Sequence, residues 1–332
     1  MYCFVNTFFK KSQKIFKTLN DEVFCNIIKI ITNRKAVMKM KIVQQTDVLA
    51  DRFGIEKALD LIADAGFDGY DYSAFHMKDD SSPMNGENYM DLAKKIKAKA
   101  DERGLKCYQS HAPFPSSRND NPVYNEDIKN KIIRSMEIAA YLGAEIIVVH
   151  PMQHLPYFFN KEKLYEDNMA FYKSLIPYAE KFGIKIATEN MFQHDDNRDV
   201  CLDSVCADGR EFNRYIDDLD SEYITGCLDL GHCGLCGRQA QEMLYVMGAE
   251  RVSCLHIHDN DYIRDRHTLP CTMSMDWDEI CKALARIGYK GHFTFEADYF
   301  LKRYDDEFIP TALKFMYDTA KYLVAKIEKY AD

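Results

Sequence analysis

Eight short β-rich runs recur along the chain from residue 40 onward, and longer amphipathic segments lie between them. The runs occupy residues 41–45, 67–73, 105–111, 145–151, 184–190, 223–231, 251–258 and 291–297. Strand patterns that alternate with helical patterns are typical of βαβ units, in which the strands form a parallel sheet. Eight such units predict an α/β fold, namely a closed (β/α)8 barrel with a short N-terminal extension.

The chain is predicted to hold one barrel domain. Amphipathic segments such as "GIEKALDLIADAG" and "DWDEICKALARIGYKG" close with a Gly shortly before the next strand, as helix C-caps do. No linker rich in Pro, Gly or Ser divides residues 40–332, so we expect one catalytic domain there. Residues 1–39 are rich in Phe, Ile, Lys and Asn, and we expect either a loosely ordered helix or a non-native upstream start.

Charge separates the extension from the barrel. Residues 1–39 hold eight Lys or Arg and two acids (+6), whereas residues 40–332 hold 35 and 50 (−15), which together give the net charge of −9. A basic arm for nucleic acid or a membrane is the alternative interpretation of the extension, but no arginine cluster supports it. The eleven cysteines are scattered and odd in number, and there is no clear secretory signal, which predicts a cytoplasmic protein.

Candidate functional side chains stand at the ends of the predicted strands. In a (β/α)8 barrel the active site collects at the C-terminal ends of the strands. Runs three to eight end with His111, His150, Glu189, Asp229 followed by His232, His258, and Glu296. Carboxylates and imidazoles that converge at one rim would repel and desolvate one another unless a cation held them, so we predict a divalent metal ion.

The stretch "LHIHDND" at residues 255–261 offers two histidines that are two residues apart. Alternation along a strand sends His256 and His258 to one face and Ile257 to the other. The pattern therefore predicts that the two imidazoles can share one concave site.

Several motifs, taken in order, resemble those of a known family. They are "SHAPF" (110–114), "VVHP" (148–151), "TEN" (188–190), "LDLGH" (228–232), "HIHDND" (256–261), "DRHTLP" (265–270), "MDW" (275–277) and "GHFTFEA" (291–297). With their strand placement, they are similar to the xylose-isomerase-like TIM barrels, which include sugar isomerases, sugar 3-epimerases, inosose dehydratases and endonuclease IV. The resemblance covers the chain from about residue 40 to its end.

The resemblance to the epimerase branch implies one divalent ion, most often Mn²⁺, with Co²⁺, Mg²⁺ or Zn²⁺ as alternatives. The implied ligands are Glu189, Asp229, His258 and Glu296. Glu189 and Glu296 would also be the catalytic acid and base that move a proton next to a ketone, through an enediolate. The implied substrate is a ketose or a related keto-sugar, and the implied protein is a metal-dependent sugar isomerase or epimerase.

Further positions follow from the same resemblance. It implies His232 and Arg264 as substrate contacts, and we add His111 and His150 because they end neighbouring strands. The residues Asp265, His267 and His256 are predicted as additional metal ligands or as supports of the ligands. A second Glu is typical six residues after the strand-five glutamate in the epimerases, whereas this chain has Asp195 there. Its "LPCTM" at 269–273 also departs from the relatives' "LPGxG".

Two other activities stay open. A keto-inositol dehydratase begins with the same enolisation and then expels a hydroxyl group. An endonuclease IV-like enzyme would hold three zinc ions for cleavage at abasic DNA. Its ligand pattern resembles His111, His150, Glu189, Asp229, His232, His258, Asp265, His267 and Glu296. The charge of −15 on residues 40–332 opposes a DNA partner, so we expect a small sugar or polyol substrate, no membrane partner, and a homo-oligomer as one option.

Overall fold

The computed structural model describes residues 40–332, and the predicted extension at residues 1–39 lies outside the described part. Eight parallel strands form one sheet in the order β10-β1-β2-β3-β4-β5-β8-β9. Their bounds are β1 Ile42–Gln45, β2 Gly69–Ser73, β3 Lys106–His111, β4 Ile146–Val148, β5 Lys185–Glu189, β8 Ile224–Asp229, β9 Val252–His256 and β10 Phe293–Phe295. All eight predicted runs contain one of these strands, which confirms the (β/α)8 barrel.

The sheet closes on itself between its first and last strands. Ile257, which follows β9, pairs in parallel with Phe295 of β10. The Ile257 N–H donates to the Thr294 carbonyl at 2.9 Å, and the Glu296 N–H donates to the Ile257 carbonyl at 3.2 Å. The contact that closes the barrel therefore lies next to the predicted site residues His256 and Glu296.

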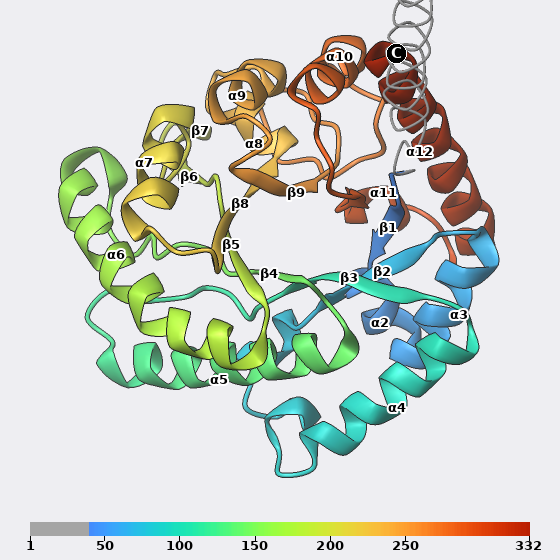
Figure 1. The fold of residues 1–332 in the computed structure, drawn as a ribbon, viewed down its shortest axis with the longest axis horizontal. Coiled ribbons are helices and arrows are strands. Elements are labelled where there is room, and N and C mark those ends of the chain that lie inside the picture. Colours follow the sequence, from blue (N-terminus) through green and yellow to red (C-terminus); the bar gives the residue numbers. More distant parts are fainter. Residues whose placement is uncertain (1–39) are drawn as a thin grey trace, which may run out of the picture. The chain divides into compact units, whose positions relative to one another are not determined.

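Helices surround the barrel (Figure 1). The larger ones are α2 Asp47–Phe53, α3 Ile55–Ala65, α4 Tyr89–Glu102, α5 Pro122–Leu142, α6 Tyr157–Phe182, α7 Gly209–Leu219, α9 Ala240–Met247, α10 Trp277–Ile287 and α12 Ile309–Ala331. The shorter ones are α8 Leu230–Leu235, α11 Asp298–Leu301 and the 3-10 turns η1 Phe75–Lys78, η2 Pro83–Asn85 and η3 Asp306–Phe308.

The helix ends follow local sequence signals. The Asp276 side chain accepts hydrogen bonds from the N–H groups of Asp278 and Glu279 and so caps the first turn of α10. Gly66 ends α3 and Gly143 ends α5, at φ values of +101° and +100°, a left-handed conformation that favours glycine. These caps fix where each helix returns to the next strand.

A hairpin interrupts the alternation after β5. Its strands β6 (Phe192–Asp195) and β7 (Val200–Asp203) pair antiparallel and form a separate two-stranded sheet. No sequence pattern indicates this hairpin, because its strands are only four residues each and carry no continuous apolar pattern. The hairpin extends from the C-terminal end of the barrel and adds a wall to the mouth.

The apolar core has two parts. The larger cluster packs the sheet against the surrounding helices, and buried members include Tyr70, Phe293 and Phe295. The smaller one contains Val148, Ala187, Cys227 and Cys254. Because side chains alternate along a strand, Ala187, Cys227 and Cys254 share a face with Glu189, Asp229 and His256, two residues further on. An apolar layer thus lies beneath the polar ends of these strands.

None of the helices in residues 40–332 is both long enough and apolar enough to cross a bilayer.

Candidate functional site

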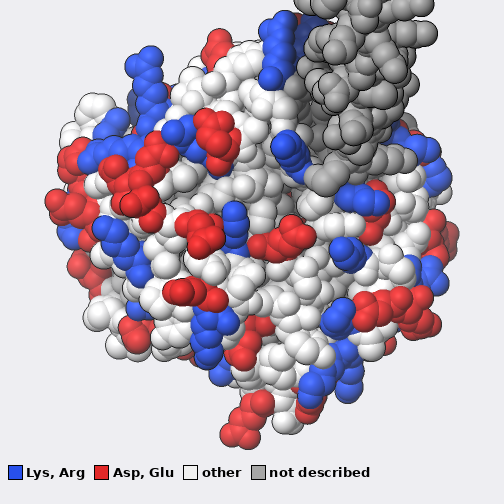
Figure 2. Space-filling model, viewed as in Figure 1, with Lys and Arg blue, Asp and Glu red and all other residues white. Residues whose placement is uncertain are grey.

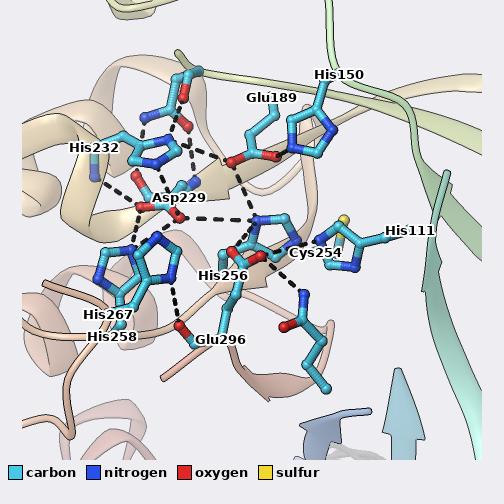
Figure 3. A network of polar contacts seen from close by, with 12 residues as sticks. His111, His150, Glu189, Asp229, His232, Cys254, His256, His258, His267 and Glu296 are labelled. Carbon is cyan, nitrogen blue, oxygen red and sulfur yellow. Dashed lines mark hydrogen bonds and ion pairs between the residues drawn. The ribbon is translucent and has the colours of Figure 1, made fainter. Parts of the chain in front are cut away.

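Three acids and one histidine converge at the C-terminal mouth of the barrel (Figure 3). Glu189 ends β5, Asp229 ends β8, His256 ends β9, and Glu296 directly follows β10. One ligand atom from each residue lies within 4.8 Å of the corresponding atoms of the other three. We call Glu189, Asp229, His256 and Glu296 the mouth group. Barrel closure thus brings together residues as far apart in the sequence as Glu189 and Glu296.

The imidazole of His256 lies between the carboxylates of the mouth group. Its Nδ1 is 3.1 Å from Glu296 Oε2, 3.2 Å from Glu189 Oε1 and 3.9 Å from Asp229 Oδ2. All four residues are buried, and Glu296 is the most exposed at 7%. Neither nitrogen of His256 makes a hydrogen bond within the described residues, and the same is true of Glu189 Oε2.

These atoms suit a divalent metal ion. Buried polar atoms are normally hydrogen-bonded, so a buried imidazole whose Nδ1 faces three carboxylates without a hydrogen bond favours a further partner between them. Three carboxylates and one imidazole form a donor set that Mn²⁺, Mg²⁺, Co²⁺ or Zn²⁺ accepts. The residues present therefore fit the metal ion predicted from the sequence.

The histidine in this group differs from the predicted one. The predicted ligand was His258, whereas the geometry groups His256 with the three acids. His258 points to the mouth as well, but its Nε2 contacts Asp229 alone among these acids, at 3.0 Å from Oδ1 and 3.1 Å from Oδ2. The two residues are about 6.6 Å apart along an extended chain, so their imidazoles lie at different distances from the three acids, and the assignment of His258 as a metal ligand stays a prediction.

The carboxylates and the imidazole of the mouth group shift the pKa values of one another toward the charged forms. Burial opposes ionisation of Glu189, but the neighbouring charges of His256 and His150 outweigh it and hold the pKa of Glu189 well below its ordinary value. Burial likewise opposes protonation of His256, yet Glu296 and Glu189 raise its pKa well above the ordinary value. The carboxylates are therefore ionised near neutral pH and available to a cation.

Two predicted substrate contacts flank Glu189. His150, which follows β4, places Nε2 3.1 Å from Glu189 Oε2, and His232 of α8 places Nδ1 3.3 Å from Oε1. His232 is further oriented by the Asn190 carbonyl, 2.8 Å from the same Nδ1. Asn190 also holds the end of β8, because its amide accepts from the Asp229 N–H at 2.8 Å and donates to the Asp229 carbonyl at 2.9 Å.

His111 lies on the opposite side of His256 and is oriented from β2. Its ring stacks on the His256 ring with centroids 4.4 Å apart. Its Nδ1 contacts Asp71 Oδ1 at 2.9 Å, while its Nε2 is 3.6 Å from Glu296 Oε1. Glu296 Oε1 also accepts a hydrogen bond from Gln45 Nε2 at 2.9 Å.

Three of these supporting residues, Asp71, Gln45 and Asn190, are not among those predicted from the sequence. Gln45 ends β1, so its position at the C-terminal end of a strand was a sequence signal for this role. A buried acid inside the β2 pattern "GYDYS" was a weaker signal for Asp71. Asn190 was visible in the "TEN" motif, but its contact with Asp229 depends on how β5 and β8 pair.

A second group of potential ligands adjoins the first. It contains His232, His258, Asp265 and His267, and one atom from each lies within 4.8 Å of the others. The shortest contact, 2.8 Å, joins His267 Nε2 to Asp265 Oδ2. Burial opposes protonation of His232, but Asp229 and Asp265 raise its pKa to about 10. The predicted additional residues Asp265 and His267 are therefore in this second group, whereas His256 is in the mouth group.

Two residues considered in the sequence analysis lie away from both groups. Arg264 is paired with Asp199 in the β6–β7 hairpin, with Nη1 2.9 Å from Asp199 Oδ1, and its side chain is 45% exposed. Asp195 pairs with Arg198, at 2.6 Å between Oδ2 and Nε. Arg264 therefore connects two mouth loops, and its role as a substrate contact stays a prediction.

The pattern of the xylose isomerase-like TIM barrel family matches residues 59–319. The chain belongs to this family. The match covers most of the barrel and contains the mouth group and its supporting residues, apart from Gln45.

Similar proteins are found both by sequence and by structure. The uncharacterized protein y4fM of Sinorhizobium fredii is 27% identical over 277 residues, which is 73% of this chain and 81% of that protein. A D-tagatose 3-epimerase-like protein superposes with a TM-score of 0.66 at 20% identity, over 87% of this chain and all of that one. The IolI protein with a bound zinc atom superposes with a TM-score of 0.64 at 18% identity, over 88% and 99% of the two chains.

Proposed function

We propose that the protein is a metal-dependent sugar isomerase or epimerase that removes a proton next to the carbonyl of a ketose or related keto-sugar. The observation that carries the proposal is the mouth group, in which Glu189, Asp229, His256 and Glu296 converge within 4.8 Å of one another. Its placement at the C-terminal end of a (β/α)8 barrel agrees with the active-site position of that fold. The likeness to a D-tagatose 3-epimerase-like protein is in line with a ketose substrate.

The mouth group would hold the metal ion. When bound, a divalent cation would polarise the substrate carbonyl and stabilise negative charge on its oxygen. We propose Mn²⁺ first, since oxygen-rich donor sets with one imidazole suit it, with Co²⁺, Mg²⁺ and Zn²⁺ as alternatives. The zinc atom in the IolI protein is in line with a metal-binding mouth in this fold.

The two glutamates would move the proton. Glu189 is kept ionised by His150 and His256, so it can accept a proton from carbon. Glu296 is kept ionised by His256 and His111 against the opposing effect of burial, and Gln45 fixes its Oε1. The two side chains approach His256 from different sides (Figure 3). If one removes the proton and the other returns it to the opposite face, the carbon is inverted, which is epimerisation.

Proton exchange with solvent tests this scheme. The metal-loaded protein should incorporate deuterium from D₂O into at least one member of a panel of free ketoses, measured by NMR. Glu189→Gln and Glu296→Gln should each lower the exchange rate by at least about 100-fold, because general acid–base groups contribute about 10²–10⁴-fold. Glu145→Gln, at an exposed position outside the mouth, is the matched control. Unchanged exchange in both mouth variants would contradict the two-base scheme.

A keto-inositol dehydratase would use the same first step and then expel a hydroxyl group. Deuterium exchange combined with loss of water from a keto-inositol, seen as a mass decrease of the product, would assign that activity instead. The geometry of the mouth group serves both reactions, because the two differ only after the proton has left carbon.

A hydrolytic enzyme with several metal ions is the second candidate. The observation that favours it is the second group, which adjoins the mouth group through Asp229 and His258. Charge opposes a DNA substrate, because residues 40–332 carry 35 basic and 50 acidic side chains, a balance of −15. On the face in Figure 2, basic and acidic side chains are interspersed. Three zinc ions per chain together with nicking of abasic DNA would establish this activity.

We also propose that the protein is located in the cytoplasm. All nine cysteines in the described part of the chain are free thiols, which is usual in a reducing compartment. Mass measurement in solution would decide whether the protein forms a homo-oligomer.

A further inference from the structure

A cleft of about 1510 Å³ opens among the loops at the C-terminal side of the barrel, and none of the four mouth-group residues lines it. Its walls come from the loop after β3, the loop and first turn between β4 and α6, the β6–β7 hairpin and the end of α8. Two wall residues contact histidines that flank Glu189. The Phe114 ring centroid is 4.5 Å from that of His150, and the Phe192 centroid is 5.0 Å from that of His232. The cleft therefore begins one side chain away from Glu189.

The cleft is larger than one sugar ring requires. Pockets for drug-sized ligands have volumes of about 300–1,000 Å³, and a six-carbon sugar is smaller than most such ligands. A ring bound at the mouth group would leave most of the cleft free. The cleft therefore has room for a second group attached to that sugar.

Two aromatic rings stand exposed at the rim of this cleft. Phe158 and Phe159, in the first turn of α6, are 78% and 83% exposed, although large apolar side chains are usually buried. The two rings meet edge to face with centroids 5.2 Å apart. Adjacent exposed aromatic rings mark a binding surface, and their flat apolar faces can pack against the C–H faces of a sugar ring.

The wall behind the two rings is held in place by hydrogen bonds. The Gln193 side chain accepts from the Tyr157 N–H at 3.0 Å and donates to the Leu155 carbonyl at 2.8 Å, which joins the hairpin to the start of α6. On the same side, Ser204 Oγ donates to Gln153 Oε1 at 3.0 Å. A cleft that is already ordered loses little conformational entropy when a ligand binds.

The charges that line the cleft favour a neutral ligand. The cationic side chains are Lys161 and Arg198, and the acidic ones are Asp195, Asp196 and Asp203. Arg198 is already paired with Asp195, at 2.6 Å. Three acids against two basic side chains leave the lining with no excess of positive charge for a phosphate group.

We propose that this cleft is a subsite for a second, neutral sugar ring, so that the substrate is a glycoside or short oligosaccharide whose keto-sugar unit lies at the mouth group. Phe158 and Phe159 form the stacking surface of the subsite, and Phe114 and Phe192 form its inner end. This inference rests on the proposed function for the position of the reacting sugar, whereas the subsite itself is tested by binding alone.

Binding of unreactive disaccharides tests the subsite. Calorimetry and saturation-transfer NMR would compare cellobiose, maltose and sucrose with glucose and fructose on the full-length protein. We expect at least one disaccharide to bind about tenfold more tightly than either monosaccharide. The double variant Phe158→Ala/Phe159→Ala should lose about tenfold in affinity for that disaccharide, since each aromatic contact contributes a factor of roughly 2 to 12. Both side chains are largely exposed, so their removal leaves the core intact.

A matched control replaces exposed aromatic residues elsewhere. Phe315 and Tyr322 of α12 are 56% and 58% exposed and do not line the cleft, so Phe315→Ala/Tyr322→Ala should bind the disaccharide like the unchanged protein. Equal loss in both double variants would overturn the proposal. Normal disaccharide binding by the cleft variant would also overturn it, and an accompanying change in the mass of the particle in solution would show that the rings are an interface between copies of the chain.

Deuterium exchange separates this inference from the proposed function. If free ketoses exchange in the unchanged protein and in the cleft variant, yet no disaccharide binds, the subsite is wrong and the proposed function stands. If a disaccharide binds through the two rings and no ketose or keto-glycoside exchanges, the subsite stands and the proposed function is wrong.

Discussion

Replacing His256 and His258 one at a time decides which imidazole belongs to the metal centre. His256 Nδ1 is within 3.1–3.9 Å of all three acids of the mouth group, whereas His258 Nε2 contacts only Asp229 among them, at 3.0 Å. His256→Ala removes a ligand atom and leaves three converging carboxylates. On this assignment, His258→Ala removes a group that orients the ligand Asp229 and that also belongs to the second group.

The two losses should differ in size. Groups that orient a metal ligand usually contribute about 10–100-fold to metal affinity, so His258→Ala should fall in that range. Loss of a ligand exceeds that range, and His256→Ala should lower the affinity by more than about 100-fold, which corresponds to more than about 2.7 kcal/mol. His292→Ala, at the opposite end of β10 from Glu296, should leave the affinity unchanged.

Titration of metal-free protein measures these affinities. Mn²⁺ can be followed by electron paramagnetic resonance of the free ion and Co²⁺ by calorimetry, and both also give the number of ions per chain. If the second group binds an ion too, His258→Ala should lower the stoichiometry by one and leave the site of the mouth group occupied. An equal or larger loss of the primary site in His258→Ala than in His256→Ala would refute the geometric assignment.

Two further predictions concern stability. A methyl group on Gly231 would lie 2.1 Å from His258 Cε1, so Gly231→Ala should cost about 1–3 kcal/mol and lower Tm, although alanine favours helix more than glycine does. Gly86→Ala, whose methyl group would meet only the Pro83 carbonyl at 3.3 Å, is the control, and equal losses would contradict the prediction. Burial holds the pKa of His292 below its ordinary value, so the unfolded chain binds the proton more readily and stability falls as the pH drops below about 6.5. Tm should therefore decrease less between pH 7.5 and pH 5 in His292→Gln than in the unchanged protein, and parallel decreases would exclude this origin.

The barrel could be predicted from the sequence because its signals are local. Each strand is a short β-rich run, and helices such as α3 and α5 end at a glycine that the chain itself supplies. The C-terminal ends of parallel strands meet at one face, so Glu189, Asp229 and Glu296 could be grouped without coordinates. The structure brings these three acids together in the mouth group.

Finer choices depended on contacts that sequence patterns do not contain. Alternation correctly sends His256 and His258 to one side, but which of them reaches the acids depends on where β9 ends against β10. The role of Arg264 as a substrate contact is implied by the family resemblance. Its position in the structure is instead set by Asp199, 65 residues away in a hairpin that no local pattern announced.

The same residues close the barrel and form the mouth group, and this overlap has an energetic consequence. β9 and β10 are joined through Ile257, whose neighbours His256 and Glu296 carry ligand atoms on the two strands. The closing contact is short, and beside it lie three buried carboxylates with one imidazole between them, so negative charge remains in excess and opposes closure. A cation bound by the mouth group would both remove that repulsion and bind the closed barrel in preference to an opened one. Ligands that bind only the folded state stabilise it in proportion to the logarithm of their concentration. The seam of the barrel is therefore the part of the fold whose stability should depend most strongly on the metal ion.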